Sequence, residues 1–122
     1  MRTRAQRVMF VADSHGRHID PTTERVARKF MDEFRPDLRY HLGDAYDLST
    51  LRKNAGFDEQ RADPAPDIEA GHALLDWYKP THFVEGNHDW RVRREFEQTT
   101  DATRRDWCRR VLVEIQSRLS GV

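Results

Sequence analysis

The amino-acid sequence predicts an α/β fold, with a mainly parallel sheet flanked by helices. Three largely apolar runs, at residues 8–12, 38–42 and 82–84, have the composition of strands, and each run ends at glycine or at polar residues that can bind ligands. The segments between these runs carry apolar residues at helical spacing. Strands that alternate with helices form parallel sheets, which gives the predicted fold class.

The first strand and helix lie near the N-terminus of the chain. Residues 8–12 are apolar at every position and are flanked by charged residues, a pattern typical of a central strand buried on both faces. Asp20 is a candidate helix N-cap, with Pro21 in the first helical position. Apolar residues at helical spacing follow up to Pro36: Val26, Ala27, Phe30, Met31 and Phe34. The pattern predicts a strand, a loop and an amphipathic helix.

The middle of the chain repeats this order. The second predicted strand, residues 38–42, closes on Gly43 and Asp44. Residues 53–66 are polar and contain one glycine and two prolines, so we expect a surface loop there. Residues 67–78 resume a helical pattern that stops at Pro80, and the third strand follows at once.

The C-terminal segment, residues 99–122, is predicted to form an amphipathic helix. Its apolar residues form one stripe: Trp107, Cys108, Val111, Leu112, Ile115 and Leu119. A helix with such a stripe must pack on another element. We expect it to cover part of the sheet face that the other helices leave open.

Size and charge restrict the class of protein. The 122 residues suit one domain, residues 1–122, and the 21 basic residues balance the 21 acidic ones, so no global field favours nucleic acid or a membrane surface. No stretch approaches the roughly 20 apolar residues of a membrane span. One cysteine cannot form an internal disulfide and suits a reducing compartment. We therefore expect a soluble cytoplasmic protein without a membrane partner.

Side chains that can bind metals follow each predicted strand. They are Asp13, His15, Asp44, Asn87 and His88. The carboxyl ends of parallel strands meet at one edge of a sheet, so these groups can converge although they are far apart in the sequence. Carboxylate, imidazole and amide donors suit Mn, Fe or Zn better than Ca.

Three motifs carry a resemblance to a known family. They are Asp13-x-His15, Gly43-Asp44-x-x-Asp47 and Gly86-Asn87-His88-Asp89. In this order, each at a strand end, they resemble the motifs of the calcineurin-like metallophosphoesterases. The resemblance covers about residues 8–89 and implies the first half of that family's αββα sandwich. It also implies hydrolysis of a phosphomonoester or phosphodiester by metal-activated water.

The resemblance implies a role for each motif residue and two divalent ions, with Mn expected and Fe or Zn as alternatives. Asp13 and His15 would bind the first ion, Asp44 would bridge both ions, and Asn87 would bind the second. His88 would face the phosphate as an acid or a stabiliser of charge, and Asp47 would orient its ring. The implied substrate is a nucleotide, a nucleic acid or a small phosphoester.

The sequence departs from the family pattern in two places. Leu48-Ser49 stands where the family's protein Ser/Thr phosphatases have Arg-Gly, and no histidine follows His88, although the family supplies a further His and a Gly-His-x-His motif. The second metal site is therefore expected to be incomplete. The chain is expected to be the N-terminal portion of a longer phosphoesterase or a truncated relative. The open half-sheet of such a chain would favour a homodimer.

Two other functions remain open. One is a degenerate module that binds metal or a partner without turnover. The other is nucleic-acid binding through the arginines that follow the third motif, although interleaved acidic residues favour a solvated helix face. Arg91 is the exception, and we expect it to bind substrate phosphate. The remaining histidines, at 18, 41, 72 and 82, are expected to be structural, with His18 close enough in sequence to face the site.

Overall fold

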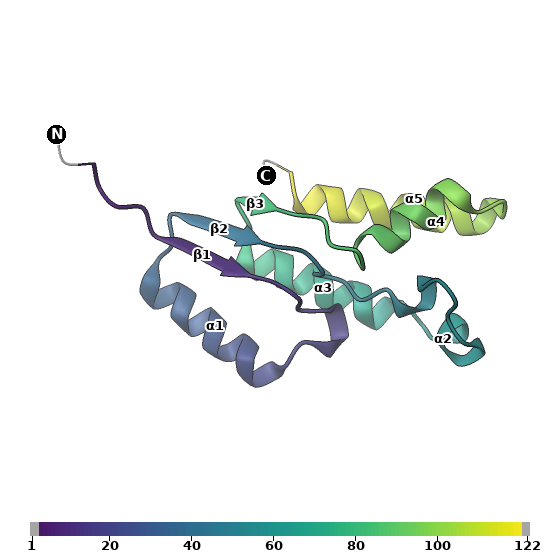
Figure 1. Ribbon diagram of the computed structural model, residues 1–122, viewed down its shortest axis with the longest axis horizontal. Helices are drawn as coiled ribbons and strands as arrows, with labels where there is room; N and C mark the ends of the chain where they lie inside the picture. The colour runs from purple at the N-terminus through teal and green to yellow at the C-terminus, as the bar shows by residue number, and fades with distance from the viewer. Residues whose placement is uncertain (1–2, 121–122) are drawn as a thin grey trace.

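The computed structural model describes residues 3–120 and contains a three-stranded parallel sheet in the order β1-β2-β3. The strands are β1 (Val8–Val11), β2 (Leu38–His41) and β3 (His82–Phe83). Helices join and flank them, as Figure 1 shows. The predicted α/β fold is thus confirmed, and each strand is one residue shorter than its predicted run.

Two long helices cover one face of the sheet. They are α1 (Pro21–Phe34) and α3 (Ala65–Tyr78). Asp20 caps α1 as predicted, because its side chain accepts hydrogen bonds from the backbone N–H groups of Thr22 and Thr23. The indole Nε1 of Trp77 on α3 donates to Glu24 on α1 over 3.1 Å, so the two helices lie side by side.

The predicted loop at residues 53–66 contains more structure than the sequence indicated. A 3₁₀ turn, η2 (Ser49–Leu51), precedes it, and a short helix, α2 (Phe57–Arg61), lies inside it. A second 3₁₀ turn, η1 (Gly16–His18), follows the first strand. In the described part of the chain, no helix is both long enough and apolar enough to cross a membrane.

The last two helices, α4 (Trp90–Gln98) and α5 (Ala102–Arg118), pack on each other, and α5 also packs on α3. Helix α5 buries Cys108 and Val111 in the core. The core also holds Ala45, Tyr46, Leu48, Leu51, Ile68, Leu74, Leu75 and Val92. Our expectation that α5 covers the open face of the sheet is wrong, since its stripe is used against α3 and α4.

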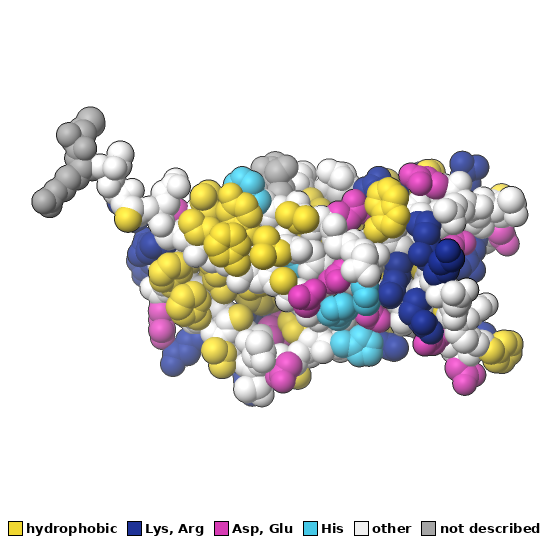
Figure 2. Space-filling model, viewed as in Figure 1, with side chains coloured by type: hydrophobic (Ala, Val, Ile, Leu, Met, Phe, Trp, Pro, Cys, Tyr) yellow, Lys and Arg dark blue, Asp and Glu magenta, His cyan; other side chains and the backbone are white. Residues whose placement is uncertain are grey.

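The face of the sheet opposite α1 and α3 is open. Phe10, Leu42 and Val84 are 59%, 48% and 53% exposed. Along this face the ring of Tyr40 lies between those of Phe10, at 5.1 Å, and His82, at 4.3 Å. The prediction that residues 8–12 are buried on both faces is therefore wrong. Helices cover only the side that carries Met9, and Figure 2 shows apolar side chains gathered over the strands.

Candidate metal centre

The first two motifs lie in neighbouring loops at the carboxyl ends of β1 and β2. Backbone hydrogen bonds join these loops from Asp13 N to Gly43 O (3.0 Å) and from His15 N to Asp44 O (2.9 Å). Asp13, His15 and Asp44 have φ values of 55°, 49° and 58°, in the left-handed region that non-glycine residues rarely adopt. The loop geometry is thus set by backbone pairing that does not depend on a ligand.

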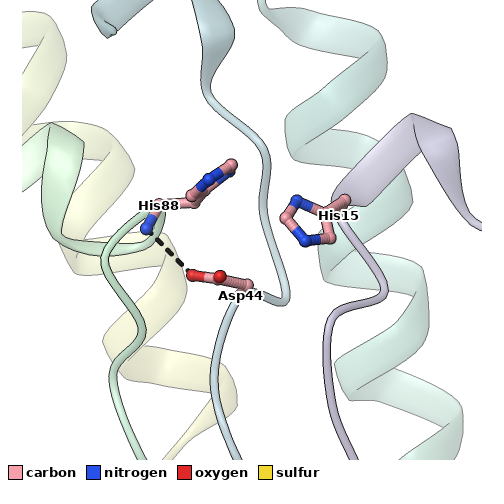
Figure 3. A group of neighbouring side chains, drawn as sticks. All are labelled: His15, Asp44 and His88. Atoms are coloured by element: carbon pink, nitrogen blue, oxygen red, sulfur yellow. Dashed lines mark hydrogen bonds between the residues drawn. The ribbon is translucent and has the colours of Figure 1, made fainter. Parts of the chain in front are cut away.

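His15, Asp44 and His88 come together at this edge of the sheet. Each offers one ligand atom, and these atoms lie within 4.8 Å of one another. Figure 3 shows the three side chains around a common space, with the backbone N–H of His88 donating to Asp44 Oδ1 over 2.9 Å. One residue comes from each motif, as the convergence of strand ends predicts.

Asp47 lies between the two imidazoles. Its Oδ1 atom is 3.2 Å from His15 Nδ1 and 3.1 Å from His88 Nδ1, and its Oδ2 atom is 3.5 Å from His18 Nε2. Burial alone would raise the pKa of the Asp47 carboxyl, but the hydrogen bonds from His15 and His88 outweigh it and lower the pKa. Asp47 therefore fixes both rings through Nδ1 and leaves each Nε2 atom for another partner.

Asp13 lies at the margin of this cluster. The Asp13 side chain is 71% exposed, and its Oδ1 atom is 3.8 Å from His15 Nε2. Asn87 is exposed. The structure thus brings His15, Asp44, Asp47 and His88 together, while the side chain of Asn87 is exposed.

Arg91 is buried beside the cluster. One of its guanidinium nitrogens donates to the backbone oxygen of Asp47 over 2.7 Å, and another is 3.3 Å from His88 Nε2. Burial lowers the pKa of this guanidinium, Asp47 opposes that effect, and the positive charges of Arg52 and Arg94 add to it. Arg91 is therefore in contact with two motif residues.

Asp89 ties the third motif to the second, a role that the sequence did not reveal. Its buried carboxylate accepts from the backbone N–H groups of Asp44 (2.7 Å), Tyr46 (3.0 Å) and Gly86 (2.9 Å). Burial raises the pKa of Asp89, although these hydrogen bonds oppose the rise. The signal was present in the sequence, because an acidic residue closes the third motif.

Asp67 on α3 supports the other side of the site. It is buried and accepts from the backbone N–H groups of Leu48 (2.9 Å), Asp47 (3.2 Å) and Arg17 (3.4 Å). Gly16, at φ +53°, lies so close to Asp67 that a Cβ atom there would clash with its carboxylate. No local pattern marks Asp67, because its partners lie 19 to 50 residues away.

Comparison with known proteins decides the family. The family model described as calcineurin-like phosphoesterase matches residues 6–119. The chain belongs to the calcineurin-like phosphoesterase family. The match extends beyond the three motifs and includes both α4 and α5. Searches of curated proteins and of solved structures found no match.

Calcineurin-like phosphoesterases bind divalent metals, and the donors of this chain suit such an ion. Two imidazoles and one carboxylate form a ligand set that favours Mn, Fe or Zn. Asp47 supplies the carboxylate–histidine contact that orients imidazole ligands at metal sites. The residues present therefore fit one ion between His15, Asp44 and His88.

Proposed function

We propose that this phosphoesterase-family chain is an active hydrolase that uses divalent ions to cleave a phosphomonoester or phosphodiester. We propose Mn as the preferred metal. The observation that carries the proposal is the grouping of His15, Asp44 and His88 within 4.8 Å, one residue from each motif. Bound ions of this kind polarise a phosphoryl group and lower the pKa of a coordinated water toward about 7.

We assign the first ion to Asp13, His15 and Asp44, and the second to Asp44 and Asn87. The short distances around His15 and Asp44 support the first assignment. A second ion at Asp44 and Asn87 would have fewer protein ligands than the first, and its Asn87 ligand is exposed. Fe or Zn would suit the same donors.

His88 is proposed to give a proton to the leaving group. Asp47 holds its Nδ1 atom, and its Nε2 atom lies 3.3 Å from Arg91, a contact that the Nε2 atom would have to give up in order to carry the proton. His88 is also close enough to Asp44 to ligate the first ion. A His88→Ala variant separates the two roles. If His88 is only a proton donor, the variant loses turnover but keeps its Mn²⁺ affinity. If His88 is a metal ligand, the variant binds Mn²⁺ about tenfold or more weakly.

Asp44→Asn tests the proposal directly. We expect the variant to lose Mn²⁺ affinity and the Mn-dependent hydrolysis of an aryl phosphodiester such as bis(p-nitrophenyl) phosphate. Asp32→Asn, at an exposed position on α1, is the matched control and should leave both unchanged. Full turnover by Asp44→Asn would contradict the proposed site.

A degenerate module that binds metal without turnover is the second candidate function. The exposure of Asn87 favours it, because the proposed second ion then has one exposed protein ligand besides Asp44. This candidate predicts Mn²⁺ binding by wild-type protein with no hydrolysis of the diester at any Mn²⁺ concentration. Mn-dependent turnover that Asp44→Asn removes would exclude it.

We also propose that a second copy of the chain covers the open face of the sheet. Within the described residues, the strand positions on this face carry no Asp, Glu, Lys or Arg side chain. It is formed by Val8, Phe10, Leu38, Tyr40, Leu42, His82 and Val84. An uncharged face needs an uncharged partner, and a two-fold axis would place this face against itself, as in sheet-on-sheet packing.

A further inference from the structure

A basic cleft lies next to the metal centre. It has a volume of about 360 Å³, and its basic lining residues are Arg52, Lys53, Arg94 and Arg104. Figure 2 shows Lys and Arg side chains gathered beside the histidines, where Figure 1 places α4 and the segment between η2 and α2. The two features therefore open on the same face of the molecule.

Helix α4 connects the cleft to the metal centre. It begins two residues after His88, and it carries Arg91 and Arg94 three positions apart, so both project from one side of the helix. Arg91 contacts His88 and the backbone of Asp47, while Arg94 donates to the backbone oxygen of Leu51 at the cleft. The two guanidinium groups thus form a row that leads from the site into the cleft.

The cleft retains positive charge after its ion pairs are counted. Arg52 pairs with Glu59 through two hydrogen bonds of 2.9 Å, and Arg104 lies 2.6 Å from Glu95. Among residues 3–120, neither Lys53 nor Arg94 forms an ion pair with a carboxylate.

We propose that this cleft binds a second phosphate group of the substrate, so that the substrate carries at least two phosphates. One phosphate lies at His15, Asp44 and His88, and the next lies between Lys53, Arg94 and Arg52. Guanidinium groups donate paired hydrogen bonds to phosphate oxygens, and the lysine adds a mobile positive charge. The inference rests on the proposed phosphoesterase function and specifies the substrate class of the same site.

Two sources could supply this chemistry: a polyphosphate and a chain of nucleotides. They share the second phosphate, and they differ in that nucleotides also present bases. Binding of tripolyphosphate and of 5′-phosphorylated tetrathymidylate to the full chain would compare them. Tighter binding of the tetrathymidylate indicates a nucleotide chain, and tighter binding of tripolyphosphate indicates a polyphosphate.

The test measures binding by calorimetry with metal-free protein, so it does not depend on turnover. We expect wild-type protein to bind at least one of the two probes about tenfold more tightly than orthophosphate. The double variant Arg52→Gln, Lys53→Gln should lose about tenfold in affinity for that probe, with a smaller salt dependence. The control variant Arg25→Gln, Lys29→Gln removes the same charge from exposed positions on α1 and should stay within about twofold of wild type.

Equal binding of orthophosphate and both probes would overturn the inference, as would unchanged affinity in the Arg52→Gln, Lys53→Gln variant. These failures are distinguishable from failure of the proposed function. If the chain hydrolyses the aryl diester but does not prefer the longer anions, the proposed function stands and the proposed role of the cleft is refuted. If the chain binds the longer anions tightly through Arg52 and Lys53 but shows no turnover, the proposed role of the cleft stands and the proposed hydrolase activity is refuted.

Discussion

The carboxylate of Asp89 accepts a 2.7 Å hydrogen bond from the backbone N–H of Asp44, 45 residues earlier in the chain. The same carboxylate binds the N–H groups of Tyr46 and Gly86, so one buried side chain joins the loops after β2 and β3. The distance between the second and third motifs is therefore fixed by the protein itself. A metal ion would enter a site whose two sides are already held together.

Replacement of Asp89 should destabilise the fold. Asp89→Ala leaves three backbone N–H groups without their acceptor, and each buried unsatisfied donor costs about 1–3 kcal/mol. We expect the free energy of unfolding of the metal-free protein to fall by roughly 3 kcal/mol or more in urea titrations. Asp32→Ala, an exposed acid on α1, is the control, and equal losses in the two variants would contradict this role.

Gly71 is predicted to be required for packing. A Cβ atom at this position on α3 would overlap the ring of Tyr46, which is fully buried. Gly71→Ala gains about 1 kcal/mol of helix propensity, but overpacking costs about 1–3 kcal/mol or more, and we expect a net loss of stability. Gly56→Ala has no atom within 4 Å of its added carbon and should change the stability by less than about 1 kcal/mol. A stabilised Gly71→Ala protein in thermal unfolding would refute the overlap.

His41 should make the fold sensitive to acid. Burial lowers its pKa from 6.5 to about 4, and its Nδ1 atom accepts from the backbone N–H of Gly43 over 3.1 Å, as only a neutral ring can. The unfolded chain binds a proton below pH 6.5 and the folded chain only below about pH 4. Stability from this group is therefore full above pH 6.5 and falls by roughly 3 kcal/mol as the pH drops to 4.

Unfolding of His41→Gln in urea between pH 4 and pH 7 checks this dependence. The variant should be less stable at pH 7, because the packing of the ring against Phe83 is lost, yet its stability should change less with pH. His82→Gln is the matched control at an exposed histidine and should keep the wild-type slope. A wild-type slope in His41→Gln would assign the acid sensitivity to another group.

Arg91→Ala should raise KM for a phosphoester about tenfold, if the guanidinium binds substrate phosphate. Because Arg91 also contacts Asp47 and His88, kcat should fall as well. Arg91→Lys keeps the positive charge but lacks the paired donors, so its KM should lie between those of wild type and Arg91→Ala. Steady-state kinetics separates these effects, and an unchanged KM in Arg91→Ala would limit Arg91 to positioning.

The open face of the sheet predicts a concentration-dependent dimer. Phe10→Lys places a charge on this face beside Tyr40, and a charge buried there without a partner is costly. We expect sedimentation to show a dimer for wild-type protein and a monomer for Phe10→Lys. Phe57→Lys replaces a ring on α2 that is still more exposed, at 71%, and lies away from this face, so this variant should remain dimeric. A monomeric wild type at all concentrations would contradict the second copy.

Much of the fold was predictable because it depends on local patterns. The cap at Asp20 and the helical spacing that follows it marked α1, and glycine or polar residues marked the strand ends. The exposure of Phe10 was not predictable, since an apolar run does not say how many faces of a sheet are covered. Whether helices lie on one side or both depends on where distant segments pack.

The candidate site was also predictable only in part. The three motifs predicted which residues meet at the sheet edge, and the structure places His15, Asp44, Asp47 and His88 there. The exposure of Asn87 was not predictable, because it depends on the path of the loop after β3, which its sequence does not specify. Asp67 was missed because its role exists only when α3 packs beside the loops it supports.

The left-handed backbone of the site loops limits how this protein can gain stability. At Asp13, His15 and Asp44 this conformation costs about 1–2 kcal/mol each, and glycine would relieve it only by deleting the ligand. Arg35 and Lys79 have the same conformation, at φ 49° and 48°, at the ends of α1 and α3. Selection for a more durable fold can therefore place glycine at these helix ends. The strain beside the metal centre must persist for as long as its side chains are needed.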